Sequence, residues 1–277
     1  MTSLSIENAL QTWLLDQQRQ RARGKRRHRA IVWSWQIISV VLLLGSWQVA
    51  ADMRWIDPFF TSSPYAVYLY LTKALVSASF WSDVGITVFE SGASFVGGSV
   101  AAIAVGFLLA QSDIARDATR PFLIILNSMP RIALAPLLII WLGLGMGSKI
   151  AVGLSLTFFV VLNGTLVGVD SVDPDLRLLS RQLGLTRGEI FRKIVLPSSV
   201  VSIFAALNLG LVYGFLGVVV AEMLAAPKGL GHAIQYHAGV LQTDAVLGIV
   251  LFLALLVTAF VFLLDMLERH FLRWRKR

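Results

Sequence analysis

Six apolar segments, each long enough to cross a bilayer as a helix, constrain the fold of this chain more than any other feature. A hydrocarbon core of about 30 Å needs about 20 helical residues. Only 14% of the residues are charged, against about 25% in an ordinary soluble domain. The apolar runs are continuous rather than alternating, which disfavours a β-barrel. We therefore predict an all-α polytopic membrane protein with six spans, at Ile31–Ala51, Val84–Ala110, Pro121–Trp141, Ile150–Val169, Val200–Ala221 and Val246–Leu264.

The basic residues predict the orientation of these spans. They concentrate in the N-terminal segment 1–30, in the tail 269–277 and in the central stretch Asp173–Pro197, which an even number of spans puts on one side. The outward loops Asp52–Asp83 and Glu222–Ala245 hold only Arg54, Lys73 and Lys228. Because positive charge marks the cytoplasmic side, we expect both termini there, flanking a membrane domain at 31–268. The pI near 10.2 thus reflects membrane anchoring, and we expect no nucleic-acid partner.

Two smaller patterns refine this topology. In the N-terminal segment, Leu10, Trp13 and Leu14 favour a short interfacial helix. Small residues recur at intervals of four in the second span (Gly98, Ala102, Gly106 and Ala110) and in the fifth (Gly210 and Gly214). Such stripes let helix backbones approach closely in lipid. They predict tight helix packing, within the subunit or across a dimer.

The polar stretch Asp173–Pro197 predicts two short helices separated by a glycine. Asp173 followed by Pro174 is a favourable helix start. Gly184 is a natural stop in the left-handed region, and Thr186 with Glu189 matches a capping box that starts a second helix. We expect Pro197 to end that helix. A helix pair held in water between two spans is suited to contact with another protein.

Polar groups within the spans need a partner or water, because a charge at mid-bilayer costs several kcal/mol. Arg131 follows Pro130 in the third span, and Pro136 also interrupts that helix. Two interpretations stay open: Arg131 lines an aqueous path suited to an anion, or it forms a structural ion pair with a glutamate, Glu90 or Glu222. The residues predicted to line a path are Asn127, Pro130, Arg131, Asn208, Tyr213 and Glu222; Asn163 is polar as well.

Motifs for enzymatic chemistry are missing from the sequence. Residues 143–149 are glycine-rich but have the wrong spacing for a phosphate-binding loop. His232 and His237 have no third ligand nearby, and the chain has no cysteine, so we predict no metal site. No nucleophile elbow occurs. We predict a transporter subunit that is not an enzyme and binds no cofactor; energy for uphill transport would come from another subunit or an ion gradient.

The central stretch resembles the EAA loop of permease subunits of bacterial binding-protein-dependent ABC importers. That pattern, E-A-A-x3-G-x9-I-x-L-P, is matched at the glycine and at the terminal I-x-L-P, with Leu-Leu-Ser in the E-A-A places. Leu178 stands where the family has glutamate, which is a departure. The resemblance implies contact with the ATPase through Leu178, Leu179, Ser180, Arg181, Gly184, Ile194, Leu196 and Pro197.

Further segments resemble the nitrate, sulfonate and taurine subgroup of these permeases. They are Asn127–Leu137 with Ile140–Gly143, then Val220–Met223 with Gly229–Gly231, and Leu241–Asp244. The resemblance covers roughly residues 35–270. Glu90 is a second departure, since the subgroup often has arginine at that position.

The resemblance implies the six-helix MetI-like fold of type I importers in the bacterial inner membrane. It also implies a second copy of the chain, two ATPase subunits that bind ATP and Mg²⁺, and an extracytoplasmic solute-binding protein. The transported solute would be a small organic or inorganic anion such as a sulfonate, taurine or nitrate. Two alternatives stay open: a secondary transporter driven by an ion gradient, and an ABC importer of a neutral heterocycle such as a vitamin precursor.

Overall fold

The computed structural model describes Trp13, His28 and residues 31–271. Every regular element in the described part of the chain is a helix. The chain divides into two compact units, Met1–Ala66 and Val67–Arg277. Apart from Trp13, the residues of the predicted interfacial helix lie outside the described residues, as do the last residues of the basic tail.

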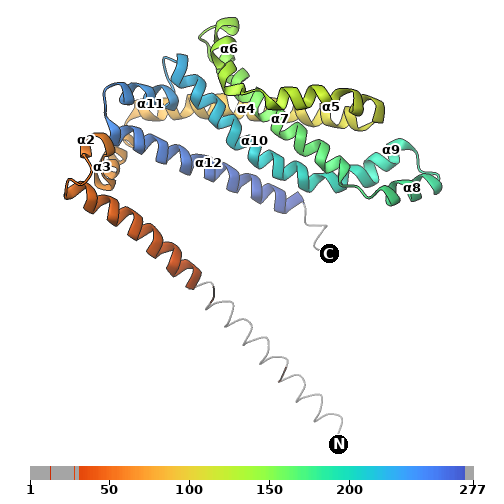
Figure 1. Ribbon diagram of the computed structural model, residues 1–277, viewed down its shortest axis with the longest axis horizontal. Helices are drawn as coiled ribbons and strands as arrows, with labels where there is room; N and C mark the ends of the chain where they lie inside the picture. Colours follow the sequence, from red (N-terminus) through yellow and green to blue (C-terminus); the bar gives the residue numbers. More distant parts are fainter. Residues whose placement is uncertain (1–12, 14–27, 29–30, 272–277) are drawn as a thin grey trace, which may run out of the picture. The chain divides into compact units, whose positions relative to one another are not determined.

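The first unit contains an apolar helix, Ile31–Asp52, followed by α2 (Pro58–Thr61). The remaining helices, shown in Figure 1, are α3 (Pro64–Ala74), α4 (Ala78–Ala110), α5 (Asp113–Ser128), α6 (Ala135–Leu142), α7 (Met146–Asp170), α8 (Pro174–Gln182), α9 (Arg187–Ile190), α10 (Leu196–Ala225), α11 (Leu230–Gly239) and α12 (Thr243–Phe271). Five helices are long and apolar enough to span a membrane, and a bent pair, Ile114–Ser128 with Arg131–Leu142, makes up to six among the described residues. The six predicted spans are therefore all present as helices. The short helices α3 and α11, in the expected outward loops, were not predicted.

Helix α7 forms the centre of the second unit, with α4 and α10 packed along it. The stripes of small residues make this close approach possible. A Cβ on Gly106 of α4 would lie 2.6 Å from Thr165 Cγ2 of α7, and one on Gly210 of α10 would lie 2.7 Å from Val161 Cγ2. The predicted tight packing is thus found within one subunit.

The third span differs from a single straight helix. Helix α5 begins at Asp113, eight residues before the predicted start of the third span at Pro121, because Ser112 caps it by accepting a hydrogen bond from Ala115 N at 3.2 Å. The helix then ends at Ser128, and a 3₁₀ turn, Arg131–Leu134, leads into α6 at a bend of 78°. Proline lacks the backbone donor that a continuous helix would need at position 130. The break therefore falls where the sequence predicted an interruption.

Pro197 does not end the second short helix, which corrects our expectation. The chain continues from α9 through a π-helical turn, Phe191–Val195, directly into α10. In that turn Leu196 N donates to Phe191 O, five residues earlier. The wider turn accommodates a proline whose ring would otherwise clash with the carbonyl four residues before it. As a result, the helical stretch Arg187–Ala225 runs for 39 residues.

Candidate translocation site and coupling segment

The segment between α7 and α10 folds as the helix–glycine–helix unit predicted from its sequence. Asp173 Oδ1 accepts from Asp175 N at 2.9 Å and caps α8. At the other end Gly184 has φ +80°. Gly184 N donates to Arg181 O at 3.0 Å and Leu185 N donates to Ser180 O at 3.1 Å. These two bonds are the Schellman motif that closes a helix through a left-handed residue.

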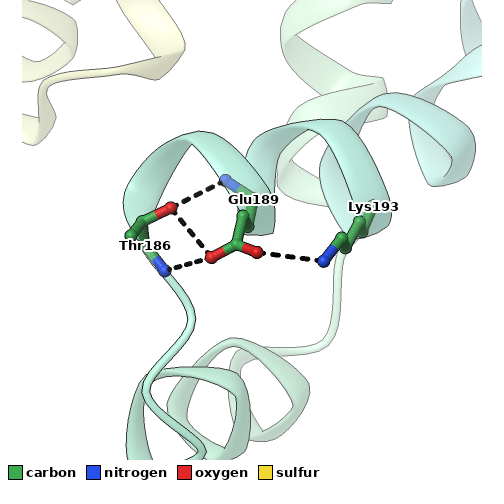
Figure 2. Close-up of polar contacts among 3 residues, drawn as sticks. All are labelled: Thr186, Glu189 and Lys193. Atoms are coloured by element: carbon green, nitrogen blue, oxygen red, sulfur yellow. Dashed lines mark hydrogen bonds and ion pairs between the residues drawn. The ribbon is translucent and has the colours of Figure 1, made fainter.

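The capping box of α9 is complete, as Figure 2 shows. Thr186 N donates to Glu189 Oε2 at 3.0 Å, and Glu189 N donates to Thr186 Oγ1 at 3.3 Å. Lys193 Nζ lies 3.0 Å from Glu189 Oε1, one turn later. The hydrogen bond from the Thr186 backbone, followed by the contact with Lys193, lowers the pKa of Glu189 to about 2. Glu189 is therefore ionised at neutral pH, when its carboxylate accepts both contacts.

The residues predicted to contact an ATPase divide into an exposed group and a supporting group. Leu178 and Leu179 are 56% and 51% exposed on α8, and Arg181 is exposed beside them. Ser180 is buried instead and donates to Leu176 O at 2.6 Å. Ile194, Leu196 and Pro197 are half-buried. Helix α8 thus exposes leucine side chains to solvent, whereas the half-buried residues Ile194, Leu196 and Pro197 anchor α9 to the spans.

The anchor beneath α9 is an apolar cluster formed with the ends of α4 and α7. Its buried members are Val169, Val172, Ile190 and Val195. Phe191 of the π-helical turn meets Phe107 of α4 edge-on, with ring centroids 5.1 Å apart. A displacement of α9 is therefore transmitted to these spans through packed side chains rather than through a flexible link.

A cavity of about 740 Å³ opens between the broken third span, α7 and α10. Three of the predicted path residues, Asn127, Arg131 and Tyr213, line it. Asn163 and Ser202 add further polar groups, and the remaining walls are apolar, including Leu156 and Val160 of α7. We refer to this space as the Arg131 cavity.

A polar chain crosses the wall of the Arg131 cavity. Arg131 Nη2 donates to Asn127 Oδ1 at 2.8 Å, and Asn127 Nδ2 donates to Asn163 Oδ1 at 3.1 Å. The same Arg131 nitrogen donates to Leu126 O at 2.8 Å, a carbonyl at the end of α5 where the helix breaks. The guanidinium lies 4.1 Å from the centroid of the Phe159 ring. These contacts hold a half-buried cation at the cavity without neutralising its charge.

The alternative of a structural ion pair for Arg131 is not what the structure shows. Among the described residues, Arg131 forms no salt bridge with Glu90 or Glu222. Glu222 is fully buried elsewhere, near α11. Asn208 also lies outside the cavity, where its Nδ2 donates to Asp265 Oδ1 of α12 at 2.7 Å. Pro130 contributes by breaking the span before Arg131 rather than by lining the cavity.

Glu222 belongs to a second polar site, which we call the α11 cluster. It consists of the side chains of Asp83, Thr87 and Glu222 and the backbone N–H groups of residues 229–231. Thr87 Oγ1 donates to Glu222 Oε1 at 2.8 Å and accepts from Leu230 N at 2.9 Å. Gly231 N donates to Glu222 Oε2 at 2.7 Å. The α11 cluster therefore ties the start of α11 to α4 and α10.

Sequence reasoning missed Asp83 and Thr87, the α4 residues of the α11 cluster, although a signal was present. Asp83, Thr87, Glu90 and Ser94 are spaced by four, three and four residues, which places them on one face of a helix. Thr87, Glu90 and Ser94 are all buried, and Ser94 Oγ donates to Ile150 O of α7 at 3.0 Å. A periodic polar face in an otherwise apolar span indicates internal contacts of this kind.

Lys149 is a buried cation whose partners are backbone carbonyls. Lys149 is 2% exposed at the start of α7, where its Nζ donates to Leu144 O and, at 3.0 Å, to Gly145 O. Lysine at this position thus caps the backbone carbonyls before α7.

No group of three histidine, aspartate or glutamate residues with metal-binding geometry occurs in the described part of the chain.

Comparisons with known proteins identify what this arrangement belongs to. Residues 98–277 match the family described as the binding-protein-dependent transport system inner membrane component. The chain is similar to the taurine transport system permease protein TauC of Escherichia coli (strain K12), with 27% identity over 263 residues, covering 90% of this chain and 96% of the relative. It is also similar to the riboflavin transport system permease protein RibX of Chloroflexus aurantiacus, with 29% identity, covering 86% and 88% of the two chains.

A solved structure shows the same fold. A chain of the MetNI methionine ABC transporter, described in inward-facing conformations, matches with a TM-score of 0.59 and 22% identity, covering 68% of this chain and 94% of that one. This likeness confirms the predicted fold of type I importers. The helix–glycine–helix segment and the Arg131 cavity both lie within the residues that the family match covers. The chain belongs to the family of inner-membrane components of binding-protein-dependent transport systems, as the permease subunit of an ABC importer.

Proposed function

We propose that this permease imports a small organic or inorganic anion, such as a sulfonate, taurine or nitrate, through the Arg131 cavity. The observation that carries the proposal is the cation at the cavity wall, which is held by Asn127 and Phe159 and is not paired with a carboxylate of the described residues. An anion passing through would exchange water for charge-assisted hydrogen bonds. The named taurine permease among the relatives supports this solute class.

The assembly we propose follows from the apolar side chains that α7 and α10 leave exposed beside the cavity. The Arg131 cavity opens beside exposed apolar side chains of α7 and α10, including Val167 (63% exposed) and Leu209 (56% exposed). A second copy of the chain would cover this face and close the path. Two ATPase subunits would bind α8 and α9 on the cytoplasmic side. The termini would lie on that side as well, because the basic residues favour it.

The mechanism we infer couples the two sites mechanically. ATP and Mg²⁺ would be bound by the ATPase subunits, since permeases of this family lack an ATPase site of their own. Their closure would move α8 and α9. The apolar cluster at Val169 and Ile190 links α9 to α4 and α7, and the π-helical turn continues α9 into α10. Those helices line the Arg131 cavity or pack beside it. The movement would expose the cavity to one side of the membrane and then to the other.

Uptake by the reconstituted assembly tests the role of Arg131. Vesicles containing the permease, its ATPase and its binding protein would be supplied with labelled taurine, methanesulfonate or nitrate. We expect vanadate-sensitive uptake of at least one, and an at least tenfold reduction by Arg131→Gln. Arg120→Gln is the matched control, because Arg120 is exposed on α5 and lies outside the cavity. Normal anion uptake by Arg131→Gln would overturn the proposal.

A second candidate function is the import of a neutral heterocycle. The relative named as a riboflavin transport permease supports it, as do the apolar walls of the cavity at Leu156 and Val160. Riboflavin would be included in the same uptake assay. Uptake of riboflavin without anion uptake, unchanged by Arg131→Gln, would favour this function over the first.

A further inference from the structure

Asn163 is the polar side chain that the central helix α7 contributes to the Arg131 cavity. The other α7 residues at the cavity lack a polar side chain and are Leu156, Val160, Gly164 and Val167. Asn163 is exposed, although it lies within a predicted span. Hydrocarbon offers no hydrogen bond to an amide, so a polar side chain at this position is suited to contact with water or a solute.

The direction of the hydrogen bonds that run from Arg131 to Asn163 is fixed at the charged end. A guanidinium carries donors and no acceptor, so Asn127 must turn its oxygen toward Arg131. The amide nitrogen of Asn127 therefore faces Asn163, whose oxygen accepts the bond at 3.1 Å. The NH₂ group of Asn163 is left without a partner in the described part of the chain. The polar chain thus ends in a free donor at the cavity.

The guanidinium of Arg131 has unused donors as well. Its hydrogen bonds to Leu126 O and Asn127 Oδ1 both come from Nη2, and its Nε has no partner among the described residues. Neither aspartate nor glutamate lines the cavity in this part of the chain. Ser202 and Tyr213 add hydroxyl groups, which can also donate. The polar groups at the cavity are therefore rich in donors, and one of them carries a positive charge.

We propose that Asn163 is a second solute contact, whose NH₂ group donates to one oxygen of an oxyanion while the guanidinium of Arg131 donates to another. This proposal rests on the proposed function, since it requires an anion in the Arg131 cavity. A sulfonate or nitrate has several oxygens and can accept from both groups at once. The bound anion would bridge the broken third span and α7. Asn127 acts as a positioning residue, because it orients both contacts.

Uptake by the complete assembly in vesicles tests the contact. The probe is whichever of labelled taurine, methanesulfonate and nitrate the wild type imports. We expect Asn163→Leu, which is similar in size but cannot donate, to lower the maximal rate at least fivefold and to leave the apparent KM for the loaded binding protein within twofold. Asn163→Gln keeps an NH₂ group and should be at least twofold faster than Asn163→Leu.

Ser155→Ala is the matched control in this assay, because Ser155 is a half-buried polar residue of α7 outside the cavity. We expect it to change uptake less than twofold. A wild-type rate in Asn163→Leu, or equal losses in Asn163→Leu and Ser155→Ala, would overturn the contact.

A double mutant distinguishes direct contact from an indirect effect on Arg131. If Asn163 acted only by holding Arg131 in place through Asn127, adding Asn163→Leu to Arg131→Gln would lower uptake no further. We expect a further reduction of at least threefold, because the amide donates to the anion itself. An unchanged rate in the double mutant would reduce Asn163 to a positioning residue and overturn the proposal.

Assembly and stability are measured on the same preparations. Asn163→Leu should leave the elution volume of the permease–ATPase complex and the midpoint of its thermal unfolding at the wild-type values. Loss of the complex in Asn163→Leu would show that the amide contacts the second copy of the chain instead of the solute, which would overturn the proposal.

Two outcomes separate this proposal from the proposed function. Normal uptake by Asn163→Leu together with the expected loss in Arg131→Gln would overturn the Asn163 contact and leave anion import intact. Wild-type vesicles that import riboflavin and none of the three anions would overturn the proposed solute class, and with it the oxyanion contact.

Discussion

At the scale of single residues, Gly184 has the most sharply defined requirement in the helix–glycine–helix unit Asp173–Pro197. No atom lies within 4 Å of a Cβ built on it, so space does not limit substitution; its φ of +80° does. A left-handed conformation costs an ordinary residue about 1–2 kcal/mol, and a β-branched residue more. The Schellman motif that ends α8 therefore depends on glycine at this position.

We predict that Gly184→Val separates ATP hydrolysis from uptake. The strained residue should displace α8, and we expect uptake to fall at least fivefold while the permease still inserts and the ATPase still hydrolyses ATP. Gly188→Val is the control, because Gly188 also has open space but an ordinary φ. Uptake at the wild-type rate by Gly184→Val would contradict this role.

A second residue-scale prediction concerns the hydroxyl of Thr87, which donates to Glu222 and accepts from Leu230 N. Thr87→Val keeps the shape but leaves these buried groups without that partner, each at a cost of about 1–3 kcal/mol. We expect a loss of about 2–4 kcal/mol, seen as a lower midpoint of thermal unfolding in detergent. Thr72→Val, which removes an exposed hydroxyl bonded to Leu69 O, should change the midpoint little; equal losses would refute the assignment.

Individual site residues were predictable where a local rule applied to them. Arg131 stands out in the sequence because a charge within a span needs an explanation, and its neighbour Asn127 bonds to it. Asn208 and Glu222 satisfied the same rule but bond to Asp265 and Thr87 instead. Their partners lie 57 and 135 positions away, a separation that sequence patterns do not encode. Polarity within a span thus indicates that a partner exists without identifying it.

At the scale of elements, the π-helical turn Phe191–Val195 sets the rotation of α9 relative to α10. We predict that Pro197→Ala relaxes this turn toward α geometry, because alanine restores a backbone donor and removes the ring. One residue of helix corresponds to about 100° of rotation, so Ile190 should leave the apolar cluster.

The absence of native cysteines makes this rotation measurable. Val169 and Ile190 share the apolar cluster, so we expect a Val169→Cys, Ile190→Cys pair to crosslink in the wild-type background. The yield should drop when Pro197→Ala is added, together with uptake. An unchanged yield would indicate that the turn is held by packing rather than by proline.

The capping box of α9 predicts a pH dependence confined to acid. The pKa of Glu189 is lowered to about 2, from about 4.3 in an unfolded chain. A lowered pKa in the folded state stabilises α9 above the unfolded value, and this stabilisation is lost as pH falls toward 2. We expect hydrogen-exchange protection of residues 186–193, corrected for intrinsic rates, to stay constant from pH 7 to 5 and to fall below about pH 4.

Glu189→Gln should remove that acid-dependent step, since glutamine does not titrate. Glu268→Gln on α12 serves as the control and should leave the step in place. A wild-type decline near neutral pH would show that another group controls α9.

Element boundaries were predicted well where capping signals stood in the sequence and less well elsewhere. The starts of α8 and α9 and the stop at Gly184 follow from their caps. Pro197 was misjudged because the chain accommodates the proline through a wider helical turn, in which Phe191 packs against Phe107. Local rules describe what a residue disfavours, whereas the surrounding structure decides how the chain accommodates it.

At the scale of the whole molecule, the fold class and the number of spans followed from hydropathy alone, because lipid permits few architectures. The energy source for transport did not follow from hydropathy. An ion-gradient-driven transporter remained open on the sequence, and family membership excludes it. That the α11 loop is tied to α4 and α10 by a buried polar cluster could be seen only in three dimensions.

Alternating exposure of the Arg131 cavity gives a prediction for the full assembly. In inside-out vesicles, Ser202→Cys, which lines the cavity, should react with a membrane-impermeant maleimide at least fivefold faster in one nucleotide state than in the other. The states to compare are nucleotide-free and vanadate-trapped. Ser199→Cys, at a fully buried position one turn away on α10, should stay unlabelled in both. Equal rates for Ser202→Cys would contradict a moving path.

The unbroken run from α9 through α10 has a mechanical consequence. It begins at the capped end beside α8 and finishes at Glu222, within the α11 cluster. A lever of these 36 residues, about 54 Å long, moves its far end by about 5 Å for each 5° of tilt. Binding at the two ends of such a lever is thermodynamically linked. If a ligand at one end changes the affinity for a ligand at the other end by some factor, the second ligand changes the affinity for the first by the same factor. A partner that binds one state of the α11 end more tightly therefore also shifts the equilibrium at the α9 end.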